Sequence, residues 1–188
     1  MTTSHHNYLP KQYQVNNQLP INHNYLPQQF SNSEVIFDEI KELVKRGDFT
    51  LGQAVNELED EFKKITQTKY AIGVGNGTDA IFLSLKAIGI DKGDEVITVA
   101  AGFPTTVNPI IQNGLVPVFV DVNLDDYDID VAQLETAWSP KVKAVMLAHT
   151  LGNPFNLEKV TKFIEKYNLW FIEDCCDAVG STYNGKMV

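Results

Sequence analysis

The stretch VKAVMLAHTLGNPFNLEKVTKFIEKYNLWFIEDCCDA, residues 142–178, contains two short apolar runs with an amphipathic segment between them. The runs 142–148 and 169–172 have the length and composition of buried strands. Segment 157–167 repeats its apolar residues at helical spacing. A strand, a helix and a second strand in this order predict two parallel strands joined by a crossover helix.

The same alternation extends toward the N-terminus. Further strands are expected at 70–74, 95–99 and 116–120, and further helices at 78–88, after Pro104 and at 130–138. Pro109 is expected to kink or shorten the helix that follows Pro104. Five strands alternating with helices predict an α/β fold, with a mostly parallel sheet and helices on both faces.

The N-terminal region has a different composition. Residues 1–30 are rich in Asn, Gln, His, Tyr and Pro, which is typical of a low-complexity, largely disordered arm. Order is expected to begin with Ser33 as the N-cap of a helix that ends at Gly47. A second amphipathic helix then places Val55, Leu58, Phe62 and Ile65 on one face. We divide the chain into this arm and one domain, 31–188.

Composition limits the classes of partner. The 188 residues are 44% hydrophobic and carry a net charge of −9, so neither nucleic acid nor an anionic membrane is an expected partner. No apolar run is long enough to span a bilayer. The neighbouring Cys175 and Cys176 are poorly placed for a mutual disulfide, which favours the reducing cytoplasm. Residues 183–188 are typical of a turn into another strand, so we expect a fragment.

Gly75-Asn76-Gly77-Thr78-Asp79 lies between a predicted strand and a predicted helix. Glycines allow the backbone to approach a phosphate closely, and the N-terminus of the helix attracts an anion. The alternative is a tight turn with a capped helix. A dinucleotide fingerprint would need glycine at position 78 and an acidic residue after strand 95–99, where Ala100 and Ala101 stand instead.

Asp174 follows the last apolar run, at the sheet edge where α/β proteins bind ligands. A carboxylate there can hold the protonated ring nitrogen of a pyridine cofactor. Capping a helix or solvating a loop is the alternative role for this aspartate. Phe103, between Gly102 and Pro104, can stack on a flat cofactor or pack in the core.

Three further loops contain polar or sulfur side chains. His149 can line a site or bond a neighbouring backbone group, and Asn153 can lie near a ligand. As an isolated pair, Cys175 and Cys176 are expected to be buried apolar residues. Loop 121–130 is a poor calcium loop, so Asp130 is expected to cap a helix.

Five motifs in order resemble the DegT/DnrJ/StrS family of nucleotide-sugar aminotransferases and dehydrases. They span Gly47 to Gly52, Gly75 to Ala80, Gly93 to Thr98, Pro117 to Asp121, and Ile172 to Asp174. The resemblance implies part of the large domain of the aspartate-aminotransferase architecture, fold type I of the pyridoxal phosphate (PLP) enzymes. It also implies a homodimer.

The resemblance implies a role for several residues. Gly77 and Thr78 would hold the cofactor phosphate, Phe103 would stack on the pyridine ring, and Asp174 would pair with the ring nitrogen. Asp177 stands where the aminotransferases usually carry a glutamine near the ring hydroxyl. That departure weakens the aminotransferase interpretation.

Segments 101–109, 148–155 and 173–178 are similar to the CDP-4-keto-6-deoxyglucose 3-dehydrases of lipopolysaccharide and O-antigen deoxysugar synthesis. This branch implies 3-dehydration of a nucleotide-linked keto sugar with pyridoxamine phosphate (PMP), and a histidine in place of the Schiff-base lysine. It further implies a 2Fe–2S cluster with Cys176 as one ligand, and a flavin/iron–sulfur reductase as electron donor. The loop Gly75 to Ala80 is instead similar to the aminotransferases, which remain the alternative.

The catalytic residue is not identified in this sequence. The resemblance places the catalytic lysine or histidine beyond Val188, and Lys186 belongs to the turn after the last predicted strand. We therefore expect the chain alone to bind PLP weakly at best and to turn over no sugar. A nicotinamide-dependent oxidoreductase and a non-catalytic interaction protein remain as alternatives from other classes.

Overall fold

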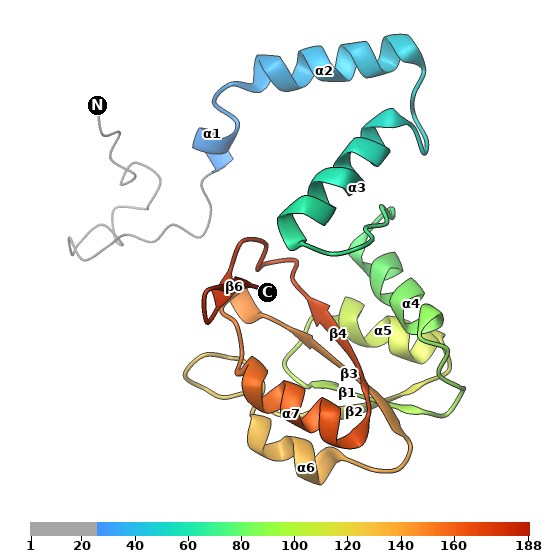
Figure 1. Ribbon diagram of the computed structural model, residues 1–188, viewed down its shortest axis with the longest axis vertical. Helices are drawn as coiled ribbons and strands as arrows, with labels where there is room; N and C mark the ends of the chain where they lie inside the picture. The colour runs from blue at the N-terminus through green and yellow to red at the C-terminus, as the bar shows by residue number, and fades with distance from the viewer. Residues whose placement is uncertain (1–25) are drawn as a thin grey trace, which may run out of the picture. The chain divides into compact units, whose positions relative to one another are not determined.

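The computed structural model describes residues 26–188, which form two compact units that meet between Glu57 and Leu58 (Figure 1). The predicted disordered arm, 1–30, lies outside the described residues except for its last five. Within those five, Leu26–Gln29 form the short helix α1. No helix in 26–188 is both long and apolar enough to cross a bilayer.

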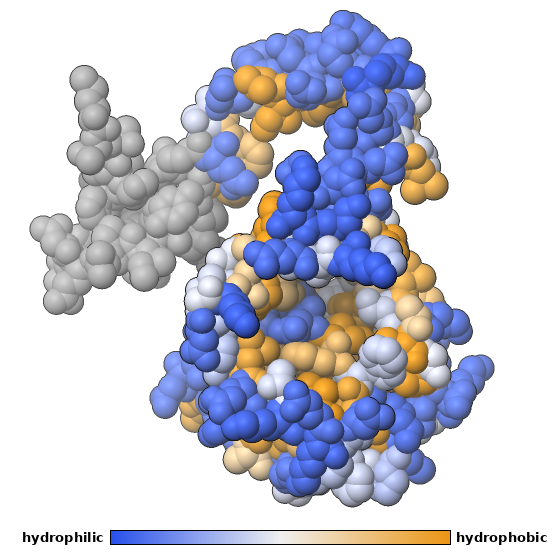
Figure 2. All heavy atoms as spheres, in the orientation of Figure 1, coloured by the Kyte–Doolittle hydropathy of each residue, from blue (hydrophilic) through white to orange (hydrophobic). Residues whose placement is uncertain are grey.

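The first unit contains α1, α2 (Ser33–Arg46) and the beginning of α3 (Gln53–Thr66). Gly47 ends α2 with a left-handed φ of 69°, as predicted. The predicted N-cap was wrong by one residue, because Ser33 is already helical and Asn32 precedes it as the cap. Figure 2 shows apolar atoms gathered along one side of α2, whose exposed apolar residues are Val35, Ile36, Phe37, Ile40 and Val44.

The start of α3 explains why the motif Gly47 to Gly52 contains Asp48 and Gly52. The carboxylate of Asp48 accepts a hydrogen bond from the Gln53 amide at 2.9 Å, which satisfies one free amide of the helix start. A Cβ atom at position 52 would collide with this carboxylate. Glycine at 52 therefore lets Asp48 reach the helix.

The second unit is built on a four-stranded parallel sheet in the order β2-β1-β3-β4. The strands are β1 (Glu95–Val99), β2 (Val116–Val120), β3 (Val142–Ala148) and β4 (Trp170–Asp174). These confirm four of the five predicted strands. In the register, Ala148 at the end of β3 lies opposite Asp174 at the end of β4.

Helices cover both faces of this sheet, as predicted (Figure 1). On one face, α4 (Gly77–Ala87) and α5 (Pro104–Gln112) pack on Val96, Ala144 and Met146. On the other, α6 (Leu134–Ala137) and α7 (Leu157–Tyr167) pack on Ile97, Val145 and Leu147. Neighbouring strand residues thus point to opposite faces, and both faces are buried.

Two predictions about helix ends are also confirmed. Helix α5 begins at Pro104 and is only nine residues long, with Pro109 inside it. Asp130 accepts a hydrogen bond from the Ala132 amide at 3.1 Å and caps the 3₁₀ turn η3 (Val131–Gln133), which leads into α6.

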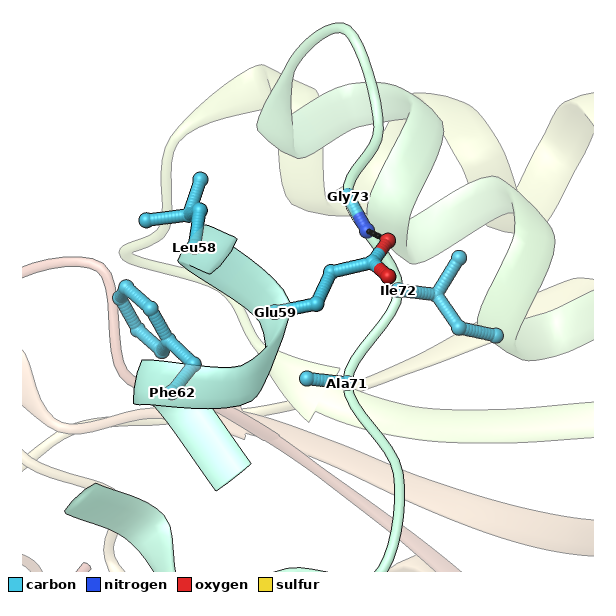
Figure 3. Close-up of a pocket in the computed structure, with 6 residues that line it drawn as sticks. All are labelled: Leu58, Glu59, Phe62, Ala71, Ile72 and Gly73. Atoms are coloured by element: carbon cyan, nitrogen blue, oxygen red, sulfur yellow. Dashed lines mark hydrogen bonds between the residues drawn. The ribbon is translucent and has the colours of Figure 1, made fainter. Parts of the chain in front are cut away.

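The predicted strand at 70–74 was wrong. Among the described residues no strand pairs with this segment, and Ile72 is 81% exposed. The Gly73 amide donates instead to the Glu59 carboxylate of α3 at 2.7 Å (Figure 3). This bond borders a small apolar pocket of about 210 Å³, lined by Leu58, Glu59, Phe62, Ala71, Ile72 and Gly73.

The last described residues form a hairpin of β5 (Thr182–Tyr183) and β6 (Lys186–Met187). Asn184 and Gly185 connect the two strands with φ values of 50° and 77°. Two consecutive left-handed residues of this kind are typical of tight hairpin turns. The predicted turn into another strand is confirmed, but Lys186, which was expected in the turn, is the first residue of β6.

Candidate functional site

A pocket of about 490 Å³ lies at the carboxyl ends of β3 and β4. In the order β2-β1-β3-β4 the connections from β1 and from β3 lead to opposite edges of the sheet, and ligands of α/β proteins bind at such a switch point. Two helix starts and two strand ends contribute the lining, which consists of Gly77, Thr78, Ala80, Ile81, Ser84, Thr105, Met146, Ile172, Glu173, Asp174, Cys175 and Cys176.

One end of the pocket is the first turn of α4. The Asn76 side chain caps this helix by accepting a hydrogen bond from the Asp79 amide at 2.9 Å. Within residues 26–188, the amides of Gly77 and Thr78 have no hydrogen-bond partner. Free amides at the positive end of a helix are a binding site for phosphate.

Asp174, the last residue of β4, adds a carboxylate to the pocket lining. One oxygen of its carboxylate accepts a hydrogen bond from the Cys176 amide at 3.0 Å. A carboxylate has two oxygens with several lone pairs, so acceptor capacity remains for a ligand. The structure thus brings Thr78 and Asp174, which are far apart in sequence, into one pocket.

Three polar residues of the pocket lining, Ser84, Thr105 and Glu173, were not predicted from sequence. Ser84 and Thr105 carry hydroxyl groups, whereas the Glu173 carboxylate lies 3.1 Å from His149 Nε2. The signal for Ser84 was its spacing from Thr78 and Ile81, because residues three apart lie on one side of a helix. The signal for Thr105 was its place directly after a proline that begins a helix.

Both cysteines lie on the pocket, and the expectation that they are buried apolar residues was wrong. Cys175 is half-buried and Cys176 is exposed, because the chain turns away from the sheet directly after Asp174. Partial burial and then the neighbouring Asp174 carboxylate raise the pKa of the Cys176 thiol to about 11. Burial followed by Glu173 and Asp174 also raises the pKa of Cys175.

The raised pKa predicts slow alkylation of Cys176. Near pH 8 a thiol with a pKa of about 11 holds roughly a hundredfold less thiolate than one with a pKa of 9. The more basic thiolate is the stronger nucleophile, so the net slowing by iodoacetamide is about tenfold relative to a free cysteine. Asp174→Asn removes the neighbouring charge and is expected to accelerate the reaction. Mass spectrometry on a Cys175→Ser background isolates the site, and an ordinary rate there would contradict this prediction.

His149 lies outside the pocket lining. Its imidazole is 1% exposed, Nε2 lies 3.1 Å from the Glu173 carboxylate, and the ring stacks on Phe155 at 4.2 Å between centroids. Nδ1 has no hydrogen-bond partner in the described part of the chain. His149 thus contacts Glu173 and the core residue Phe155. A role of His149 in lining the site stays a prediction.

Asn153 also lies outside the lining. Its side-chain amide donates to the carboxylate of Asp128 at 3.2 Å. Asp128 is 3% exposed and also accepts from the Thr150 amide at 3.2 Å. Sequence reasoning missed Asp128, because only the folded loops show that this aspartate of an acidic stretch is buried.

Phe103 and Asp177 flank the pocket without lining it. Phe103 is 73% exposed and directly precedes α5, two residues before Thr105. Asp177 is exposed on the loop after β4, next to Cys176. Both positions leave the side chains accessible, and their cofactor contacts stay predictions.

Residues 26–188 contain no group of three or more His, Cys, Asp or Glu side chains that could hold a metal ion. An iron–sulfur cluster needs several thiolates, and two cysteines, Cys175 and Cys176, lie in this part of the chain. Cys176 as one ligand of a cluster, with the other ligands further along the chain, stays a prediction.

Comparison with known proteins identifies the family. The model of the DegT/DnrJ/EryC1/StrS aminotransferase family matches residues 31–188. The chain belongs to this family. The family resemblance predicted from the five sequence motifs is thus confirmed. The matched residues include Thr78 and Asp174, which lie at the two ends of the pocket.

Two curated members of the family show how close the relation is. The lipopolysaccharide biosynthesis protein RfbH of Salmonella typhimurium is 50% identical over 150 residues, covering 76% of this chain and 34% of RfbH. The dTDP-4-dehydro-2,6-dideoxy-D-glucose 3-dehydratase of Saccharopolyspora spinosa is 43% identical over 144 residues, covering 72% and 31%. The chain spans about a third of the length of these relatives.

Solved structures show the same fold. GDP-4-keto-6-deoxy-D-mannose-3-dehydratase of E. coli, with bound hydrated PLP, matches with a TM-score of 0.76 and 32% identity, covering 81% of this chain and 41% of that one. DesV of S. venezuelae matches with a TM-score of 0.82 and 27% identity, covering 87% and 44%. The fold is part of the type I architecture of PLP enzymes, as predicted.

Proposed function

We propose that this chain forms the cofactor pocket of a PLP- or PMP-dependent nucleotide-sugar enzyme, most closely a 3-dehydratase of a CDP-4-keto-6-deoxyhexose. One observation carries the proposal: the free helix start at Thr78 and the carboxylate of Asp174 line the same pocket. A cofactor with a phosphate at one end and a basic ring nitrogen at the other needs this pair of groups.

At the phosphate end, the proposal is supported by two backbone amides without a partner among residues 26–188. The amides of Gly77 and Thr78 and the Thr78 hydroxyl would hold the phosphate at the N-terminus of α4. Asp79 opposes an anion, but its carboxylate accepts a hydrogen bond from the Asn76 side chain at 2.9 Å, which offsets part of its charge.

At the other end, Asp174 would accept a hydrogen bond from the protonated ring nitrogen. A nearby negative charge favours the protonated nitrogen. Phe103 would stack on the ring and Asp177 would lie near the ring hydroxyl. When bound, the cofactor supplies an amine that condenses with a keto sugar and a pyridinium ring that accepts electrons.

The residue that moves the proton is not assigned. The pocket lining from residues 26–188 contains neither lysine nor histidine. The chain's own contribution is therefore to bind the phosphate, orient the ring and hold its nitrogen protonated.

Dehydration is favoured over transamination by the relatives of highest identity given above, one a 3-dehydratase by name and the other a lipopolysaccharide biosynthesis protein. Transamination of a 4-keto or 3-keto sugar is the second candidate. It is supported by the aminotransferase-like loop Gly75 to Ala80 and by GDP-perosamine synthase of Escherichia coli O157:H7, which is 37% identical over 137 residues and is covered to 38%.

Partners and location are also proposals. The family supports a homodimer, and the exposed apolar side of α2 gives a surface for one (Figure 2). A flavin/iron–sulfur reductase would deliver electrons to a dehydratase that completes a 3-deoxy sugar. The nucleotide-sugar substrate and the two unpaired cysteines support a cytoplasmic location.

The full-length protein with PMP and CDP-4-keto-6-deoxyglucose tests the reaction. Dehydration removes one water from the bound sugar, and after reduction by an added two-electron donor the released 3-deoxy sugar is lighter by one oxygen. Transamination predicts an amino sugar when glutamate is added with PLP. Mass spectrometry distinguishes the two products, and a cofactor-loaded protein that forms neither would contradict both candidates.

A further inference from the structure

Three loops at the carboxyl edge of the sheet are joined to one another by hydrogen bonds. The acceptors are the buried Asp128 and the backbone of Gly152. Loop 121–130 follows β2, loop 149–153 follows β3, and segment 175–181 follows β4. Only the last of these carries pocket residues directly. The bonds between the three loops determine how firmly that segment is held.

The first connection is made by Asp128. Its two carboxylate oxygens accept separate hydrogen bonds, one from the Thr150 amide and one from the Asn153 side chain, both at 3.2 Å. The Thr150 hydroxyl donates in addition to the Tyr127 carbonyl at 3.1 Å. A carboxylate that is 3% exposed is costly unless hydrogen bonds satisfy it, so loop 149–153 is bound closely to Asp128.

The second connection is made by Gly152. The Ser181 hydroxyl donates to the Gly152 carbonyl at 2.7 Å. Gly152 has a left-handed φ of 81°, and a Cβ there would lie 2.8 Å from the Asp177 carbonyl oxygen. Only glycine allows this approach, which sets loop 149–153 against Asp177 and Ser181 of segment 175–181.

We propose that Asp128 is a positioning residue. Through Thr150 and Asn153 it fixes loop 149–153, and Gly152 of that loop holds segment 175–181. Asp128 itself does not line the pocket. Its effect on cofactor binding rests on the function proposed above, whereas its effect on the order of segment 175–181 does not.

Amide hydrogen exchange in the full-length protein tests the proposal directly. Asp128→Ala is expected to accelerate exchange about tenfold at Cys176, Ala178 and Ser181, because their hydrogen bonds open more often when the segment loosens. It is also expected to weaken PLP binding several-fold. Asp125→Asn, at an exposed position of the same loop, is the matched control and leaves both quantities unchanged.

A donor–acceptor exchange separates this role from general stability. In Asp128→Asn with Asn153→Asp, the new Asn oxygen can accept from the Thr150 amide and the new Asp can accept from the Asn side chain. This pair is expected to restore exchange and PLP affinity to within about twofold of the parent, whereas Asp128→Asn alone is not. Ser181→Ala cuts the second connection and tests the same segment if Asp128→Ala does not fold.

The outcomes are distinguishable. Unchanged exchange at residues 176–181 in folded Asp128→Ala and Ser181→Ala variants would overturn the proposal, as would failure of the exchanged pair to restore it. Accelerated exchange with unchanged PLP affinity would support the connection between the loops and overturn the expected effect of segment 175–181 on cofactor binding.

Discussion

Replacing Asp174 with alanine is expected to weaken PLP binding to the full-length protein by roughly ten- to a hundredfold, because hydrogen bonds to charged groups contribute about 1.5–3 kcal/mol. The bound cofactor should also lose its ring proton at a lower pH, since the carboxylate no longer stabilises the protonated nitrogen. Fluorescence titration gives the affinity, and absorbance against pH gives the protonation of the ring.

Two variants serve as controls for Asp174→Ala. Asp174→Asn keeps an oxygen that can accept from the Cys176 amide, so the turn after β4 is preserved while the charge is lost. We expect it to bind PLP with an affinity between those of the parent and the alanine variant. Asp125→Ala removes one exposed aspartate elsewhere and should bind like the parent. Parent-like binding by Asp174→Ala would show that the ring nitrogen faces another group.

Leu147→Ala is expected to have the largest effect on stability. Leu147 is 1% exposed and packs in the core between the sheet and α7. Removing a buried leucine side chain leaves a cavity and lowers the free energy of unfolding by about 3 kcal/mol. For a protein of this size the melting temperature should fall by roughly 10 °C, which calorimetry or circular dichroism measures.

Leu124→Ala is the matched control for the core. Leu124 is 85% exposed, so the same substitution there should change the free energy of unfolding by less than about 0.5 kcal/mol. Equal melting temperatures for the two variants would contradict the packing of β3 against α7.

The spacing of apolar residues predicted the helices and strands whose apolar side is buried in the folded domain. Helix α7 occupies Leu157–Tyr167 as predicted, because its apolar spacing and its neighbours agree. Segment 70–74 has the composition of a strand but no partner among the described residues, and Glu59 takes the Gly73 amide instead. A strand depends on a second segment, and one stretch of sequence does not indicate whether that segment is present.

The site divides in the same way. Thr78 and Asp174 were predictable because each follows from its place at the end of an element. The hydrogen-bond partners of Asp128, His149 and Asn153 were not predictable, because these partners lie more than twenty residues away in sequence. An aspartate in an acidic loop usually faces water, and only the folded loop shows that this one is buried.

A crystal structure of the full-length protein with PLP tests the central claim most directly. We predict that the phosphate contacts the amides of Gly77 and Thr78 at the start of α4. The ring nitrogen should lie about 2.7–2.9 Å from a carboxylate oxygen of Asp174, as in other charge-assisted hydrogen bonds. A phosphate bound away from α4, or a ring nitrogen that faces a residue other than Asp174, would contradict the account.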